Sequence, residues 1–521
     1  MLSAAAAKLL GAFFKIPLTN ILGGVGMSYF SCAYSIFMPV YSLTVTGLTA
    51  AVARMTAKAA ASGDRTQVQS IRRTALILFS LAGLAGSFLI ALLARPFSIL
   101  SVGNTDAAAA IVMIAPTVFF GCITAVERGY YEGMSNMYPT AISQVAEGAV
   151  KVAAGLWLCG YVTAHPDMLR RFFPEMSDIR AGAAAAGILG VTLSSVGAWL
   201  FFVVMAMFSG ERCHSSSWSA ATAKELTRTA LPTGISAVVT NLTALIDMWT
   251  VIGCLRPETA GVSGISADDI PHFVYGSFSG IALTVFNLVP SVTNMLGKGA
   301  LTCVTAAYES GDRTSLRNST VQALIVSAVI AVPASVGLGL LSREVLDILY
   351  PRQSDEVMIC VQPLRLLMPG MVCLCVSYPL FSMLQAVGKP SLPLKIMLMG
   401  TALKLAGNLL LIPFMGAEGA ALSTSLCYGA ILLISLIAYL RAAKIKLSLS
   451  PFVKVLYSGA VCGGTAYLAA AFVRMREASA LCVIIASAAA GGAAYIAMLY
   501  ILMGVHRQKK KPAQRQAENL F

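Results

Sequence analysis

Seven charged side chains lie inside apolar stretches of this 521-residue sequence. An ionised group at bilayer depth costs at least about 2.5–3.5 kcal/mol, so such groups usually face a wet cavity or a charged partner. Five are basic and two are acidic: Lys8, Lys15, Lys151, Arg365 and Lys404 against Glu147 and Asp247. A surplus of about three buried positive charges predicts a site that prefers an anion such as a pyrophosphate.

The spacing of these residues indicates which of them share a helix face. Lys8 and Lys15 are seven residues apart, which is two turns of one face. Glu147 and Lys151 are four apart and can pair with each other. That spacing leaves two interpretations open: an internal ion pair that holds the bundle together, or two groups that contact a ligand. Arg54 lies near a helix end, where its side chain can extend to the interface.

Two further helices carry polar stripes. Ser236, Thr240, Thr243, Asp247 and Thr250 follow one face of the helix expected near 229–254. Thr401, Lys404 and Asn408 follow a face of the helix expected near 392–413. Polar faces of membrane helices turn toward the protein interior, so we expect both stripes to be buried.

The elements that position these groups are predicted from composition. The chain is 57% apolar and 12% charged, with a mean hydropathy of +0.77. Soluble domains carry about 25% charged residues. We therefore expect an all-α polytopic membrane protein without a cleavable signal peptide. The twelve cysteines and four histidines are scattered, which predicts no metal site, and we expect no cofactor.

A window of about 20 apolar residues identifies transmembrane helices. It predicts fourteen here, near 4–23, 28–53, 74–94, 107–127, 139–162, 182–208, 229–254, 272–297, 318–341, 358–387, 392–413, 417–440, 452–473 and 479–504. The even-numbered connections and the tail hold 23 basic residues and the odd-numbered ones hold 9. By the positive-inside rule both termini are cytoplasmic.

Internal matches predict a repeat. Ser62-Gly63-Asp64-Arg65-Thr66 recurs as Ser310-Gly311-Asp312-Arg313-Thr314, and Lys151 corresponds to Lys404. Six spans separate the copies, so they form a parallel repeat with a substrate expected between the halves. We predict an N-lobe at 1–208, a C-lobe at 209–441, two extra helices at 442–504 and a basic cytoplasmic tail at 505–521.

Two segments carry a family resemblance. Lys8-Leu9-Leu10-Gly11 with Lys15 and Leu22-Gly23 resembles the first helix of the stage V sporulation protein B-like family. The run from Arg128-Gly129-Tyr130-Tyr131-Glu132 to Glu147 looks like that family's fourth-to-fifth helix segment. These proteins are polysaccharide biosynthesis flippases of the MOP exporter superfamily, which also contains MATE-like and MurJ-related transporters.

The resemblance implies a two-lobed, MATE/MurJ-like flippase that works by alternating access in the bacterial cytoplasmic membrane. Its cargo would be a lipid-linked anionic cell-envelope precursor, either an undecaprenyl-pyrophosphate-linked peptidoglycan precursor or a polysaccharide unit. Lys8, Lys15, Arg54, Glu147, Lys151 and Asp247 match charged positions of the family. The sequence departs from the MurJ pattern in the register of its second basic residue and in lacking an Arg at mid-depth of the eighth helix. Both departures favour the sporulation-type branch.

Alternatives remain open at this point. A cation-coupled multidrug antiporter of the same fold would need a cavity lined by carboxylates, but this interior is net basic. A membrane glycosyltransferase would need acidic residues on a large outer loop, where only Asp268-Asp269 are adjacent. We expect a monomer, not an enzyme, with the bilayer and a lipid-linked glycan as partners and no nucleic acid. The driving force would be H⁺, Na⁺ or the membrane potential.

Overall fold

The computed structural model describes residues 2–166, 178–208, 218–259, 265–389, 391–477 and 479–518. Every regular element within those residues is helical. A helix satisfies its backbone hydrogen bonds internally, which hydrocarbon surroundings require. The expected all-α polytopic membrane fold is confirmed.

The expected number of fourteen spans is not confirmed. In the described part of the chain, twelve helices are long and apolar enough to cross a membrane, and a bent pair, Ile270–Phe286 with Leu288–Asn294, raises the number to thirteen. The spans expected at 4–23 and 28–53 lie in one helical run, which no loop interrupts. A single residue breaks it: Gly23 has φ 66° and ψ −176°, a conformation that residues with a Cβ rarely adopt.

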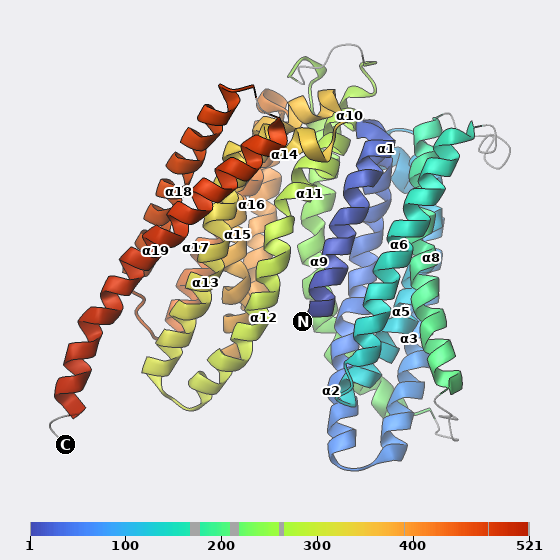
Figure 1. Ribbon diagram of the computed structural model, residues 1–521. Helices are drawn as coiled ribbons and strands as arrows, with labels where there is room; N and C mark the ends of the chain where they lie inside the picture. Colours follow the sequence, from blue (N-terminus) through green and yellow to red (C-terminus); the bar gives the residue numbers. More distant parts are fainter. Residues whose placement is uncertain are drawn as a thin grey trace. The chain divides into compact units, whose positions relative to one another are not determined.

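One compact unit comprises Met1–Thr284 together with Asn408–Ala417. Its helices up to the unit boundary are α1 (Leu2–Tyr41), the π-helix η1 (Ser42–Thr46), α2 (Gly47–Ala61), α3 (Arg65–Val102), α4 (Ala107–Ile114), α5 (Pro116–Gly133), α6 (Tyr138–Ala164), α8 (Ile179–Phe208), α9 (Ala220–Cys254), the 3-10 turn η2 (Pro257–Thr259), α10 (Ile270–Ser277) and the π-helix η3 (Phe278–Ala282). Within this unit α6 packs along α8, as Figure 1 shows.

Helix α1 also packs closely against α10 in the same unit. A Cβ added at Gly276 would collide with the carbonyl oxygen of Gly24 and would lie 2.7 Å from the backbone nitrogen of Ser28. The two backbones therefore approach each other as closely as glycine allows. This contact continues into η3, which also packs on α1.

The second unit comprises Val285–Gly407 and Glu418–Phe521. After the short α11 (Leu283–Phe286), its helices are α12 (Leu288–Glu309), α13 (Arg313–Leu340), α14 (Ser342–Leu349), α15 (Ser354–Ala386), α16 (Leu392–Met415), α17 (Ala417–Ala443), α18 (Ser450–Arg474) and α19 (Ala480–Glu518). Helix α18 packs along α19, and α12 packs along α15. The lobe boundaries expected from the repeat stay a prediction.

The repeated pentapeptide forms the same turn in each unit. Gly63 and Gly311 are both left-handed, with φ of 74° and 71°. The Asp64 carboxylate accepts from the backbone N–H of Gln67 and so caps α3. Asp312 caps α13 in the same way, because it accepts from the N–H groups of Thr314 and Ser315. Aspartate is a strongly preferred residue at such N-caps.

Candidate substrate-binding site

Lys15 lies on α1 and is held by a neutral group. Its Nζ donates to the carbonyl oxygen of Ser279 at 2.8 Å. That carbonyl belongs to the π-helix η3, and π-helical turns occur frequently at functional sites. One turn further along α1, the Thr19 hydroxyl donates to the Lys15 carbonyl at 2.8 Å. The ammonium is therefore fixed in place, but no carboxylate neutralises it in the described part of the chain.

Lys151 lies on α6 and is held by two aromatic rings. Its Nζ lies 5.2 Å from the ring centroid of Phe14 and 5.7 Å from that of Tyr34. Such cation–π contacts attract an ammonium without cancelling its charge. Lys15 and Lys151 are also close enough to repel each other electrostatically. Two half-buried cations thus lie together in one unit.

Glu147 pairs with Arg128 and not with Lys151. An Arg128 nitrogen lies 2.7 Å from the Glu147 carboxylate, and the Arg128 Nε donates to the hydroxyl of Ser143 at 3.0 Å. Ser143 and Glu147 are one turn apart on α6, so both contact the same guanidinium of α5. Arginine outcompetes lysine here because its planar group offers several donors in a fixed geometry. The i,i+4 pairing considered from the sequence is not what the structure has.

Asp247 joins the two polar stripes predicted from the sequence. Its side chain is buried, and its Oδ1 accepts from the Asn408 amide at 3.1 Å. The same amide donates to the Thr250 hydroxyl at 2.8 Å. All three residues belong to the first unit, because that unit includes the end of α16. The described side chains of both stripes are accordingly turned inward.

The part that the other predicted residues play in the site stays a prediction. The Lys8 side chain lies outside the described residues. Arg54 is exposed on α2. In the second unit, Arg365 is exposed on α15 and its Nε donates to the Ser342 hydroxyl at 2.9 Å. Lys404 is buried on α16, and its carbonyl accepts from Ser423 at 3.0 Å.

The sequence did not reveal a buried ion pair between α3 and α5. The Arg72 guanidinium contacts both carboxylate oxygens of Glu127, at 3.3 and 2.8 Å, and stacks over the Tyr130 ring. Both side chains are nearly buried, 12% and 9% exposed. The sequence places Arg72 in the basic connection expected between the spans at 28–53 and 74–94, where the positive-inside rule is enough to account for its charge. No periodicity pointed to its partner 55 residues away.

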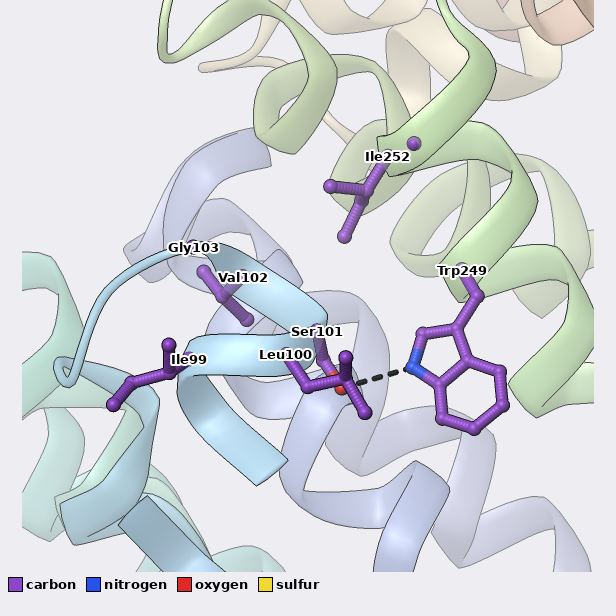
Figure 2. Close-up of a pocket in the computed structure, with 8 residues that line it drawn as sticks. Ile99, Leu100, Ser101, Val102, Gly103, Trp249 and Ile252 are labelled. Carbon is purple, nitrogen blue, oxygen red and sulfur yellow. Dashed lines mark hydrogen bonds between the residues drawn. The ribbon is translucent and has the colours of Figure 1, made fainter. Parts of the chain in front are cut away.

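A separate pocket of about 410 Å³ lies between the ends of α3 and α9. Figure 2 shows its lining, in which Leu100 and Ile252 supply apolar surface and the Trp249 indole donates to the Ser101 hydroxyl at 2.9 Å. No ionisable side chain lines this pocket. It therefore offers apolar surface and not the charge chemistry of Lys15 and Lys151.

Comparison with known proteins identifies the family. The model of the family described as "Polysaccharide biosynthesis protein" matches residues 1–331. The chain belongs to the polysaccharide biosynthesis protein family. A second family model, MatE, matches residues 277–410. The family resemblance of the first and the fourth-to-fifth helix segments is thereby confirmed, and both segments fall within the matched range.

Relatives of this chain include two proteins from Bacillus subtilis (strain 168). The chain is 23% identical to "Lipid II flippase MurJ" over 88% of its own length and 84% of that protein. It is 23% identical to "Stage V sporulation protein B" over 80% of its length and 77% of that protein.

Solved structures that share its fold include a MurJ structure and a MATE transporter. A MurJ structure in an inward closed conformation has a TM-score of 0.69 at 15% identity and covers 96% of this chain and 97% of that one. An inward-facing MATE transporter of the MOP superfamily has a TM-score of 0.66 at 15% identity, and the match covers 85% of this chain and 94% of that one. The MATE/MurJ-like fold expected from the sequence is confirmed.

Proposed function

We propose that this chain translocates a lipid-linked anionic cell-envelope precursor across the bacterial cytoplasmic membrane by alternating access. The cargo would be an undecaprenyl-pyrophosphate-linked peptidoglycan precursor or a polysaccharide unit. The observation that carries this proposal is the pair Lys15 and Lys151. Each ammonium is held by neutral groups, a carbonyl or aromatic rings, and neither is paired with a carboxylate among the described residues.

Two neighbouring cations in a membrane interior repel each other, and an anion that binds both would relieve this repulsion. A pyrophosphate has enough negative charge, and enough acceptor oxygens, to bind both ammonium groups. Arg128 occupies the Glu147 carboxylate, so this acid does not compete with such a ligand. In this proposal Lys15 and Lys151 hold the pyrophosphate, and Lys8, seven residues before Lys15 in the sequence, is a third candidate.

Family membership and the two Bacillus relatives support a transporter and not an enzyme. The sequence contains no Gly-x-x-x-x-Gly-Lys-Ser/Thr loop of the kind that cradles ATP phosphates. In the proposed cycle H⁺, Na⁺ or the membrane potential drives transport. In this proposal the protein works as a monomer with both termini in the cytoplasm, and Arg54 and Asp247 of the first unit also contact the cargo. Arg365 and Lys404, in the second unit, stay candidates from the sequence.

The test uses purified full-length protein in vesicles loaded with a fluorescent polyprenyl-pyrophosphate sugar. The appearance of the sugar on the far leaflet is measured by its accessibility to a membrane-impermeant quencher. We expect K15Q/K151Q and K8Q/K15Q/K151Q to abolish translocation. Lys58→Gln removes an exposed charge from α2 and serves as the matched control. Normal translocation by the double variant would refute the proposal.

A cation-coupled drug antiporter is the alternative, and the buried carboxylate of Asp247 favours it. In that case Asp247→Asn should abolish export of a cationic dye. The K15Q/K151Q variant should export the dye normally, because removing cations does not weaken a site for a cation. The same two variants therefore separate the two functions.

A further inference from the structure

A groove of about 520 Å³ lies in the second unit, and none of its lining residues was predicted to belong to the substrate-binding site. It is formed by the first turns of α13, the segment before α18 and the start of α18 itself. On α13 the lining residues Arg317, Val321 and Ile325 follow one face at a spacing of four. The lining thus changes from charged to apolar along about 12 Å of a single helix.

The groove carries an uncompensated positive charge. Arg317 and Lys454 are its ionisable residues, and no carboxylate lines it. The Lys454 Nζ donates to the carbonyl oxygen of Leu502 on α19 at 2.9 Å, which is a neutral acceptor. Arg317 is exposed and forms no ion pair with any described residue. Asn318, Gln322 and Ser450 add polar groups around the two cations.

We infer that this groove binds an anionic phospholipid. The headgroup phosphate lies between Arg317 and Lys454, and an acyl chain follows Val321, Ile325 and Val326 into the membrane. Charge complementarity selects the anionic headgroup, because both ionisable lining groups are cations. The apolar continuation selects a lipid, because a water-soluble phosphate compound gains nothing from it. Both α13 and α18 are candidate membrane spans, so the groove opens where lipid is available.

The test is native mass spectrometry of the full chain, which is incubated in detergent with phosphatidylglycerol or phosphatidylcholine. The lipid that stays bound after the detergent is removed is then measured. The wild type should retain phosphatidylglycerol preferentially. The R317Q/K454Q variant should bind it about thirtyfold more weakly, since each basic group near an anionic headgroup contributes about fivefold. Arg317→Gln alone should lose about fivefold. It leaves the Lys454–Leu502 hydrogen bond intact, so it separates lipid binding from packing.

Arg313→Gln is the matched control, because it removes an exposed charge from the same helix one turn before the groove. Equal retention of phosphatidylglycerol by wild type and R317Q would overturn the inference, as would an equal loss in R313Q. Inorganic phosphate is the second arm. If it displaces phosphatidylglycerol at millimolar concentration, the groove is a phosphate site and not a lipid site. A dihexanoyl lipid that binds as tightly as the dioleoyl lipid would exclude the proposed acyl contact.

Discussion

An Arg128 nitrogen lies 2.7 Å from the carboxylate of Glu147, one helical turn before Lys151 on α6. This pair decides the electrostatics of the candidate site. If Glu147 were paired with Lys151, the site would contain one cation and one internal ion pair. Because Arg128 binds the acid, Lys151 has no carboxylate partner among the described residues and lies near Lys15.

This arrangement predicts opposite effects for two substitutions on α6. Glu147→Gln should lower stability by about 1–3 kcal/mol, because it leaves the mostly buried Arg128 without its charged partner. Lys151→Gln should leave the thermal midpoint nearly unchanged and abolish translocation. Asp347→Asn, which breaks an exposed i,i+4 pair with Arg343, is the control and should change stability by less than about 0.5 kcal/mol. A loss of stability in K151Q equal to that in E147Q would contradict this assignment.

The ion pair between Arg72 and Glu127 predicts a larger structural effect. Arg72→Gln should destabilise the protein by about 3–5 kcal/mol, since it breaks an ion pair with a carboxylate that is 9% exposed. Arg72→Lys should recover only part of this loss, because an ammonium cannot contact both oxygens and also stack over Tyr130. Thermal unfolding of the purified variants in one detergent measures both effects. If Arg72→Lys unfolded at the wild-type temperature, the planar geometry of the guanidinium would not contribute to the stability of this pair.

The close contact between α1 and α10 predicts that no residue larger than glycine is tolerated at position 276. Gly276→Ala should destabilise by about 1–3 kcal/mol and slow translocation, because its Cβ would collide with the Gly24 carbonyl. The matched control is Gly337→Ala in α13, where an added Cβ meets nothing within 4 Å. That change should be neutral or stabilising by up to about 1 kcal/mol. If both variants unfold at the wild-type temperature, the close approach does not hold the two helices.

The N-cap of α3 predicts a pH-dependent contribution outside the membrane. A hydrogen bond from the Thr66 hydroxyl, and then one from the Gln67 N–H, hold the pKa of Asp64 below its usual value. Because the pKa of Asp64 is lower in the folded state than in the unfolded state, where it is near 3.9, the ionised carboxylate stabilises the fold at higher pH. This stabilisation is lost as the pH falls from the unfolded-state pKa through the folded-state pKa. Asp64→Asn keeps a capping side chain without the titration. Its thermal midpoint should therefore fall less than that of the wild type between pH 5 and pH 2.

The sequence was sufficient for features that follow from local chemistry. Helices α3 to α9 and α13 to α19 cover the expected spans to within several residues at most ends, because the apolar windows are long and the connections are polar. The repeated Ser-Gly-Asp motif was recognisable because a left-handed glycine followed by a capping aspartate needs those residue types. The stripes containing Asp247 and Asn408 were recognisable from helical spacing alone.

Contacts between distant helices were beyond the sequence. Helical spacing favours a pair between Glu147 and Lys151, four residues later on the same helix. It cannot reveal Arg128, which lies on the preceding helix α5. The same limit hid Ser279 as the acceptor for Lys15, which is 264 residues away. The single-residue break at Gly23 was also invisible, since no polar segment accompanies it.

The break at Gly23 also bears on the activation energy of transport. A continuous helix that bends during a transport cycle must first rupture backbone hydrogen bonds, and in hydrocarbon each unsatisfied group costs several kcal/mol. Helix α1 already carries its interruption in the folded state, eight residues after Lys15. The parts of α1 on either side of Gly23 can therefore change their mutual angle through one residue without adding that rupture to the barrier.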